Sequence, residues 1–206
     1  MKNLNYKLKL LYLQKILQDH TDENHGLTMA EILEHLAQYG IQAERKSVYD
    51  DIETLREFGM DIIGEKRRKN FHYALVNRDF ELAEVKVLMD AVQAANFISE
   101  KKSNQLIEKL GTLVSNHNAV QLQQQVFVSG RSKTSNEEIY YNIDKLYKAI
   151  NDNHQVRFAY CNWTVNKQLE EKHDGKEYVV SPWALIWDNE NYYLLGYHHE
   201  YKALRT

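Results

Sequence analysis

Apolar residues recur every three to four positions in the first third of the chain, a spacing typical of amphipathic helices. Residues 4–19 place Leu8, Leu11, Tyr12 and Ile16 on one stripe, with Lys15 beside Ile16. The polar run TDENHG follows and interrupts the period. We therefore predict a first helix over residues 4–19 that buries this stripe.

Two further helices are predicted before residue 60. Thr28 stands three residues before Glu31, the spacing of a capping box, and Gly40 marks the end of this second helix. The third helix is expected over about residues 44–58, with Gly59 capping its C-terminus. Its apolar face at i, i+4 and i+7 consists of Val48, Ile52 and Leu55.

The period then changes to two. The runs DIIGEK and FHYAL are joined by RRKN, as in a β-hairpin with a basic turn. Phe71, Tyr73 and Leu75 are expected to share one face of this hairpin. Three helices, a tight turn at Gly40 and a final hairpin follow the order of a winged helix-turn-helix, which we predict for residues 1–78.

Residues 79–135 regain the helical period and are predicted to be a helical linker and dimerisation region. The apolar face of its first helix is Leu82, Val85, Leu88, Met89 and Val92. Ser103 is the expected N-cap of the next helix. The apolar face of that helix is Leu106, Ile107, Leu110, Leu113 and Val114.

Residues 136–206 combine one helix with short alternating runs. The helix is NEEIYYNIDKLYKAIND, and its stripe is Ile139, Ile143, Leu146, Tyr147 and Ile150. The runs are QVRFAYC, EYVVSPW, ALIW and NYYLLGY, with turn signals HDGK and DNEN between them. They predict a small antiparallel sheet or barrel, so the fold class of the chain is α+β.

The third helix is the predicted DNA reader, because only the first turns of such a helix reach base edges in a major groove. These turns supply donors and a flat ring, and Asp50 could accept from a cytosine amino group. The residues expected to contact DNA from this helix are Arg45, Lys46, Ser47, Tyr49 and Asp50. The hairpin turn adds four cations near the phosphates: Lys66, Arg67, Arg68 and Lys69.

Charge and composition limit these expectations. Residues 1–78 hold 12 Lys and Arg against 12 Asp and Glu, and the net charge of the chain is −3. Binding to double-stranded DNA would therefore depend on local charge and fall with salt. Cys161 is the only cysteine, which excludes an internal disulfide and leads us to expect a cytoplasmic protein. The sequence has no apolar run of about 18 residues, so we expect no membrane span.

Three stretches carry a resemblance to a known family. ERKSVYDDIETLREFGMDII resembles the recognition-helix region of bacterial transcriptional regulators that end in a WYL domain. Phe80, Leu82 and Glu84 are similar to the onset of their helical linker, and YVVSPWALIWDNENYYLLGY resembles the WYL core. Tyr192 stands where the family has tryptophan, and Asp50 where many relatives have a basic or neutral polar residue.

The resemblance implies a fold and a function for residues 136–206. The family's WYL domain is an Sm- or SH3-like β-barrel that senses a ligand, often nucleotide-like or single-stranded nucleic acid. Ligand binding would alter a homodimer and, through it, the affinity for operator DNA. Relatives usually continue beyond this point, so the resemblance also implies that Thr206 is an artificial end and that the barrel is partial, with an exposed strand edge.

The candidate ligand residues follow from position in the family and from alternation. They are Ser181, Tyr193, Tyr197, His198 and Arg205. Aromatic faces would stack on bases, and Arg205 would meet a phosphate. In NYYLLGY, alternation separates Tyr192 from Tyr193, so about half of the rings are expected to be packing, and Tyr193, Tyr197 and His198 form the expected binding side.

Two other function classes remain open. The winged helix could bind protein instead of DNA, which a steep salt dependence of DNA binding would exclude. An enzyme is the weaker alternative: Ser181, Cys161, Asp174 and the pair His198-His199 are chemically able, but they stand in no nucleophile elbow or metal spacing. We expect neither a cofactor nor a metal.

Overall fold

The computed structural model of the chain describes residues 2–125, 133–134, 136–164 and 169–206. Contacts divide the chain into two compact units. The first unit is Met1–Ala94 with Ser103–Ser129, and the second is Ala95–Lys102 with Gly130–Thr206. The predicted boundary after residue 135 lies beside residues outside the described part.

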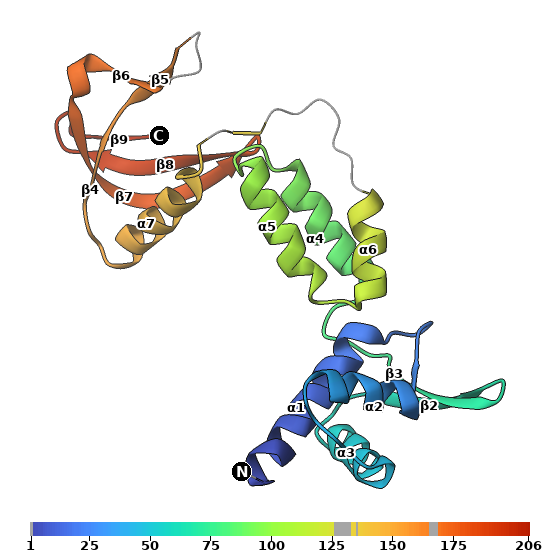
Figure 1. Cartoon of the computed structure of the whole chain (residues 1–206). Coiled ribbons are helices and arrows are strands. Elements are labelled where there is room, and N and C mark those ends of the chain that lie inside the picture. Colours follow the sequence, from blue (N-terminus) through green and yellow to red (C-terminus); the bar gives the residue numbers. More distant parts are fainter. Residues whose placement is uncertain (1, 126–132, 135, 165–168) are drawn as a thin grey trace. The chain divides into compact units, whose positions relative to one another are not determined.

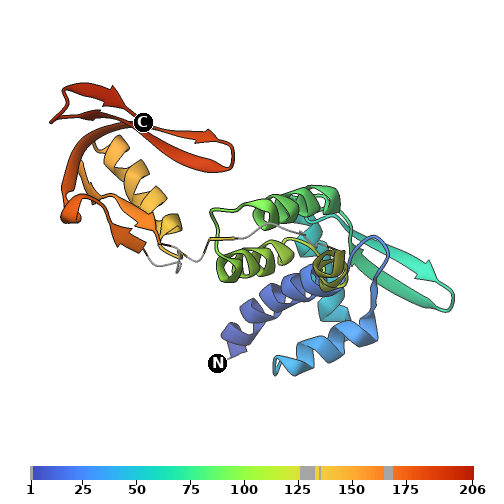
Figure 2. The same cartoon turned by 90° about the horizontal axis from the view of Figure 1, so that it is seen from above.

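The first unit begins with three helices and a small antiparallel sheet (Figure 1). The helices are α1 (Lys2–His20), α2 (Met29–Gln38) and α3 (Arg45–Glu57). The strands are β1 (Leu27–Thr28), β2 (Ile62–Arg67) and β3 (Asn70–Leu75), in the order β1-β3-β2. The β2–β3 hairpin extends away from the three helices in both views (Figure 2).

Helix ends and turns agree with the sequence signals. The Thr28 side chain accepts from the Glu31 N–H and the Glu31 carboxylate from the Thr28 N–H, so the predicted capping box is confirmed. Gly40 and Gly59 have φ of 74° and 108°, backbone that only glycine adopts without strain, and each follows a helix end. In α3 the buried residues are Val48, Ile52 and Leu55, as the period predicts.

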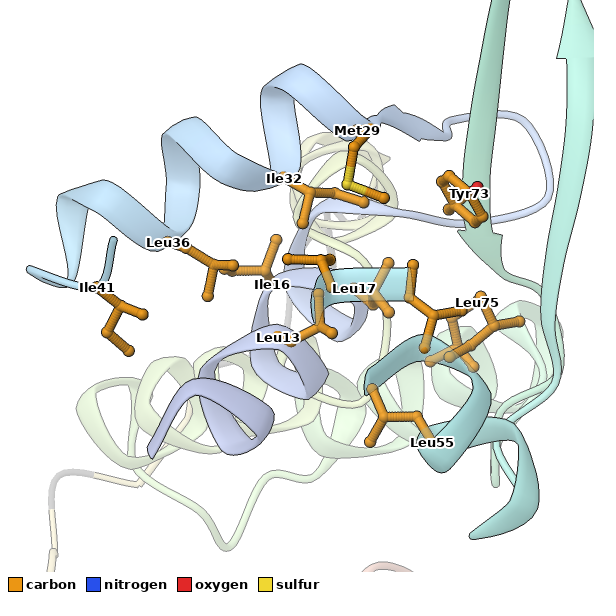
Figure 3. Close-up of a cluster of buried hydrophobic side chains, with 13 residues drawn as sticks. Leu13, Ile16, Leu17, Met29, Ile32, Leu36, Ile41, Leu55, Tyr73 and Leu75 are labelled. Atoms are coloured by element: carbon orange, nitrogen blue, oxygen red, sulfur yellow. The ribbon is translucent and has the colours of Figure 1, made fainter. Parts of the chain in front are cut away.

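The core of this region lies between α1, α2, α3 and β3 (Figure 3). Its largest fully buried side chains include Leu13, Ile16, Leu17, Ile32, Leu36, Val48 and Ile52. Full burial of each such side chain contributes about 1.5–3 kcal/mol to folding. One predicted face was wrong: Leu8 and Leu11 are 36% and 59% exposed, because the inner face of α1 runs through Lys9 and Leu13 instead.

Three more helices complete the first unit: α4 (Leu82–Ala94), α5 (Glu100–Gly111) and α6 (Asn116–Gln125). Val85 and Met89 of α4 are buried, but Leu82 and Leu88 are 41% and 39% exposed, contrary to the predicted face. Their buried partners include Val114 and Leu122. Side chains of the α4 face therefore pack where α5, α6 and the turn between these two helices cover them.

The N-cap prediction for α5 was wrong. The helix begins at Glu100, and the Ser99 hydroxyl accepts from the Lys102 N–H, while Ser103 is fully buried inside the helix. The first turn, EKKS, has no apolar residue, so the apolar period does not include it. The helix start was therefore predicted too late in the sequence. Helix α6, which the sequence did not predict, is capped by Ser115, whose hydroxyl accepts from the Asn118 N–H.

The second unit packs one helix against a curved antiparallel sheet. Helix α7 (Ile139–Asn151) lies on the concave side of this sheet and contacts β7 (Figure 2). The strands β4 (Val156–Ala159), β7 (Glu177–Asp188), β8 (Asn191–His198) and β9 (Ala203–Arg205) have the order β4-β7-β8-β9. A separate pair joins β5 (Cys161–Trp163) to β6 (Leu169–Glu171), and a short 3-10 helix, η1 (His173–Gly175), precedes β7.

Two predicted runs, EYVVSPW and ALIW, form the single strand β7. The register against β8 shifts between Pro182 and Ala184, which is a β-bulge, and Trp183 is 59% exposed there. Because proline lacks an N–H to donate to the ladder, Pro182 led to the prediction of two separate strands. The bulge lets one strand continue through it. The turn at DNEN is confirmed, with Asn189 and Glu190 both at positive φ.

Candidate nucleic-acid interface and ligand pocket

The first turns of α3 present the residues expected to contact DNA. Arg45, Lys46, Tyr49 and Asp50 are exposed there. Tyr49 lies beside Tyr73 of β3, with ring centroids 6.3 Å apart, so this end of α3 is also near the base of the hairpin. One exposed surface thus presents the hydrogen-bond donors of Arg45 and Lys46, the ring of Tyr49 and the carboxylate of Asp50.

Ser47 faces the protein. Lys9 of α1 donates to both the Ser47 hydroxyl and its carbonyl, and the Lys9 Nζ lies 2.7 Å from the Asp51 carboxylate. Lys9 is only 4% exposed, so it is a cation buried against α3. The contact holds the first two turns of α3 to α1, which fixes the direction in which Arg45, Lys46 and Tyr49 project.

The four cations of the hairpin turn separate into two groups. Arg67 donates to the carbonyls of Asn24 (2.7 Å) and Glu23 (3.2 Å) and to the Glu65 carboxylate (2.9 Å). Lys66, Arg68 and Lys69 are exposed. Arg67 therefore fastens the hairpin to the loop before β1, and the outer cations are the ones a phosphate could reach.

Phe71 and Gly64 shape the exposed side of the hairpin. The Phe71 ring packs on Tyr73, with centroids 5.3 Å apart, and is 48% exposed. A Cβ on Gly64 would come within 2.5 Å of the Phe71 ring, so the ring lies directly over the glycine backbone. Any larger residue at position 64 would displace this aromatic surface.

In the second unit, α7 and the sheet line an open pocket of about 890 Å³. Its aromatic wall includes Phe158, Tyr160, Tyr178, Tyr192, Tyr193 and Tyr201. Its cations are Lys145 of α7, Arg157 of β4, Lys172 before η1, and Arg205 of β9. Among the described residues that line the pocket there is no Asp or Glu side chain. Such a wall favours an anionic ligand with a flat ring.

His198 is a buried donor in this pocket. The ring is 7% exposed, its Nδ1 accepts from the Tyr201 N–H at 3.4 Å, and its Nε2 therefore carries the proton. Within the part of the chain that the structure describes, Nε2 has no hydrogen-bond partner. An unpaired buried donor costs about 1–3 kcal/mol, so a small shift that lets a ligand acceptor reach Nε2 would recover that free energy.

Tyr192 and Arg205 are held by neighbouring rings. Burial, with a smaller contribution from Tyr147, raises the pKa of Tyr192, which keeps its hydroxyl neutral. The Arg205 guanidinium lies 4.2 Å from the centroid of the Tyr201 ring. Both side chains are therefore positioned before any ligand arrives.

The predicted ligand residues do not share one face. Tyr193, His198 and Arg205 line the pocket, whereas Ser181 and Tyr197 are absent from its described lining. Ser181 pairs with Tyr197 in the β7–β8 register, next to the pair Val180–His198, so the two pairs point to opposite faces. The expectation that His198 shares a side with Tyr197 was wrong, since alternation sends the two to opposite faces.

Sequence reasoning also missed several pocket residues. Lys145, Arg157, Lys172 and Tyr178 come from elements that are distant in the sequence. Only the turn signal HDGK, which brings Lys172 and His173 back beside β7, pointed toward this region. The opposite face carries its own polar contact, in which the Ser181 hydroxyl lies 2.8 Å from His199 Nε2.

Among the described residues, no cluster of His, Cys, Asp or Glu has an arrangement that could hold a metal ion. Within the same residues, no helix has the length and apolar content needed to cross a membrane.

Comparison with known proteins gives a match for the C-terminal part of the chain. Residues 141–206 match the family model of the WYL domain. No curated protein sequence matches the chain. Among solved structures, the chain is similar to proteasome accessory factor B/C (PafBC) of Arthrobacter aurescens, with 22% sequence identity and a TM-score of 0.28. The match covers 98% of this chain and 29% of PafBC, so the chain spans less than a third of that protein.

Proposed function

We propose that this WYL-containing chain is a transcriptional regulator whose N-terminal region, residues 1–78, is a winged helix-turn-helix that binds double-stranded DNA. The observation that carries the proposal is the exposure of the first turns of α3, together with the exposure of Lys66, Arg68 and Lys69 in the hairpin turn. The order α1–β1–α2–α3–β2–β3 and the sheet order β1-β3-β2 support it. In the same chain, residues 141–206 match the WYL domain model, and the second unit has the pocket beside α7.

Arg45, Lys46 and Tyr49 would meet bases or phosphates in the major groove, and Lys66, Arg68 and Lys69 would lie near the adjacent backbone. Asp50 stands on the same surface, where it accepts from a cytosine amino group or repels phosphate. Because the local charges are few, affinity for DNA of arbitrary sequence would be in the range of about 10⁻⁴–10⁻⁶ M at physiological salt.

The pocket beside α7 is the proposed sensor site. Its cations and aromatic rings suit a nucleotide-like anion or single-stranded nucleic acid, with bases on the rings and phosphate at Arg205 or Lys145. Exposed apolar side chains of α4, namely Leu82, Val87 and Leu88, offer a surface for a homodimer. A dimer would place two α3 helices on a pseudo-palindromic site, and light scattering tests for it directly.

DNA binding is tested by fluorescence anisotropy of a labelled duplex across a series of salt concentrations. Changing Arg68 and Lys69 together to Ala should weaken binding and make the slope of log K against log salt shallower by about 1–2, since each lost phosphate contact removes about 0.9. The matched control changes Lys86 and Lys109, two exposed lysines of α4 and α5, and should leave the slope unchanged.

An unchanged slope in the Arg68 and Lys69 variant would remove the hairpin from the interface. Binding that does not vary with salt in the unmodified chain would favour a protein-protein module. Changing Arg67 to Ala has a different expected signature: it should lower the free energy of unfolding, because three internal hydrogen bonds are lost.

The sensor site is tested by thermal stabilisation with nucleotides and short single-stranded oligonucleotides. A ligand that raises the melting temperature should lose most of that effect when Lys145 and Arg205 are changed to Ala. Lys148→Ala, an exposed lysine of α7 outside the described pocket lining, is the control and should retain it. No stabilisation by any of these compounds would leave the sensor site without support.

A further inference from the structure

The loop between α4 and α5 belongs to the second unit, although most of the two helices belongs to the first. Residues 95–102 cluster with the sheet, while the chain up to Ala94 and from Ser103 onward clusters with the first unit. The backbone thus enters the second unit and leaves it again within eight residues. Any movement of this loop acts on both helix ends through covalent bonds alone.

An aromatic contact fixes the loop to the β7–β8 hairpin. The Phe97 ring meets Trp187 and Tyr192 edge-on, with centroids 5.1 and 5.3 Å away. Trp187 and Tyr192 also meet each other, at 4.7 Å, and they form the ladder pair one step from the hairpin turn. The three rings make a closed triangle in which each ring touches the other two.

Two hydrogen bonds of Asn96, the residue before Phe97, also hold the loop. The Asn96 amide donates to the Glu190 carboxylate in the hairpin turn at 2.6 Å. The Asn96 carbonyl accepts from the Thr134 N–H at 3.0 Å. Ile98 and Ser99, the next residues, are 8% and 6% exposed. The loop is therefore docked on the β7–β8 hairpin by ring contacts and by a hydrogen bond.

Tyr192 has a second role, because it also lines the pocket beside α7. One ring therefore touches both the space that a ligand would occupy and the loop that leads to α4 and α5. We propose that the Phe97 loop transmits the occupancy of the WYL pocket to the helical linker through Tyr192. This inference rests on the proposed function, in which the pocket binds a ligand.

The direction of the effect follows from linkage. In the docked arrangement, Tyr192 is held by Phe97 and Trp187 in the position where it forms part of the pocket wall. A ligand that contacts this wall binds the docked state more tightly and so increases its population. Coupling is reciprocal, so removing the Phe97 ring must weaken ligand binding by the same factor by which ligand favours docking.

The first experiment needs no ligand. Hydrogen-deuterium exchange of the 95–102 segment is compared in the full chain and in Tyr192→Leu, which keeps apolar bulk but removes the ring. Since an aromatic pair contributes about 0.5–1.5 kcal/mol, exchange in this segment should become about two- to tenfold faster. Tyr193→Leu is the control: Tyr193 also lines the pocket, and the described residues show no ring contact between it and Phe97.

The second experiment uses anilinonaphthalene sulfonate, an aromatic anion that suits the pocket and fluoresces when bound. It should slow exchange in the 95–102 segment of the unmodified chain. In Phe97→Ala it should still bind, about two- to tenfold more weakly, and should leave exchange in α4 and α5 unaffected. Probe binding that is lost in Arg205→Ala assigns the signal to the pocket.

The outcomes separate this inference from the proposed function. If Tyr192→Leu exchanges like the unmodified chain, or like Tyr193→Leu, the inference is overturned whatever the probe does. If the probe binds in the pocket and Phe97→Ala has full affinity, transmission is overturned while the ligand site stands. If probe binding is insensitive to Arg205→Ala, the pocket fails as a sensor site, and faster exchange in Tyr192→Leu still supports the ring contact. Should Tyr192→Leu fail to fold, Phe97→Ala decides alone.

Discussion

Lys9 shows how one side chain can fix the orientation of a helix. A lysine that is 4% exposed would be unfavourable without a partner, and its Nζ has the Asp51 carboxylate at 2.7 Å, the Ser47 oxygens, and the Tyr6 ring at 4.5 Å. These contacts connect α1 to the turn of α3 that carries Arg45 and Lys46. Lys9 therefore fixes the position of the surface that we propose to contact DNA.

Changing Lys9 to Met should lower the free energy of unfolding by about 3 kcal/mol, because Asp51 is left with no cation in a nearly closed site. Urea unfolding measures this. The double variant Lys9→Met with Asp51→Leu is the control and should recover most of the loss, since an ion pair replaced by apolar side chains is close to neutral. A single variant as stable as the unmodified chain would show that the pair does not hold the helices.

The sequence could predict α1 and α3 but not this contact. A prediction from periodicity assigns only apolar residues to the buried face, so it included Leu8 and Leu11 and left out Lys9. The actual face is centred on Leu13 and Leu17, with Lys9 one turn earlier. A buried cation is recognised only when its carboxylate is known, and Asp51 lies more than forty positions away.

At the scale of elements, Ser115 joins a helix to a distant loop. Its hydroxyl accepts from the Asn118 N–H to cap α6 and donates to the Asp22 carboxylate at 2.5 Å, and Ser115 is fully buried. Asp22 also accepts from the N–H groups of Asn24 and His25. Burial alone would raise the pKa of Asp22, but these hydrogen bonds outweigh it and lower the pKa.

Ser115→Ala should therefore cost about 2 kcal/mol of unfolding free energy, since a cap and a buried carboxylate bond are lost together. Ser99→Ala removes only the α5 cap and should cost about 1 kcal/mol. Chemical denaturation of both variants measures the difference. Equal losses would mean that the bond to Asp22 adds no stability.

Helix α6 and the strand β6 were not predicted from the sequence, for separate reasons. The run NHNAVQLQQQ is polar, and its helical state depends on burying Leu122 against α4. Strand β6 has only three residues, too few to show an alternating pattern, and it is defined by its pairing with β5. Elements with strong caps or long alternation, such as α2 and β8, were predicted because their signals are local. The pocket could not be predicted, because the described residues of its wall come from elements that are far apart in the sequence, from α7 to β9.

At the scale of the whole molecule, stability depends on pH through His20. Burial, and then the neighbouring His35 at 4.3 Å, lower the pKa of His20, with smaller effects from Asp19, His117 and Lys15. The unfolded chain takes up the proton near pH 6.5, whereas the folded chain does so at lower pH. The contribution of neutral His20 to the free energy of unfolding is therefore fully present above about pH 6.5, and it is lost as pH falls through the folded pKa.

The expected result is a lower urea midpoint for the first unit at about pH 5.5 than at about pH 7.5. In His20→Gln this difference should shrink. The lowered pKa values of Asp22 and Glu31 act in the acid range below their usual values near 4, so they do not produce a change in this window. A midpoint that is constant between the two pH values would contradict the role of His20.

The clasp of Arg67 on the carbonyls of Glu23 and Asn24 has a consequence for redesign. Because Arg67 anchors the hairpin, the charges of Arg68 and Lys69 are not needed to hold it in place. Arg68 adopts the left-handed backbone of a tight turn. Asn or Gly in place of Arg68, and residues of either charge in place of Lys69, would suit this geometry. The charge of the tip can thus be changed by substitution, so that the proposed affinity for a polyanion could be tuned while the rest of the protein stays unchanged.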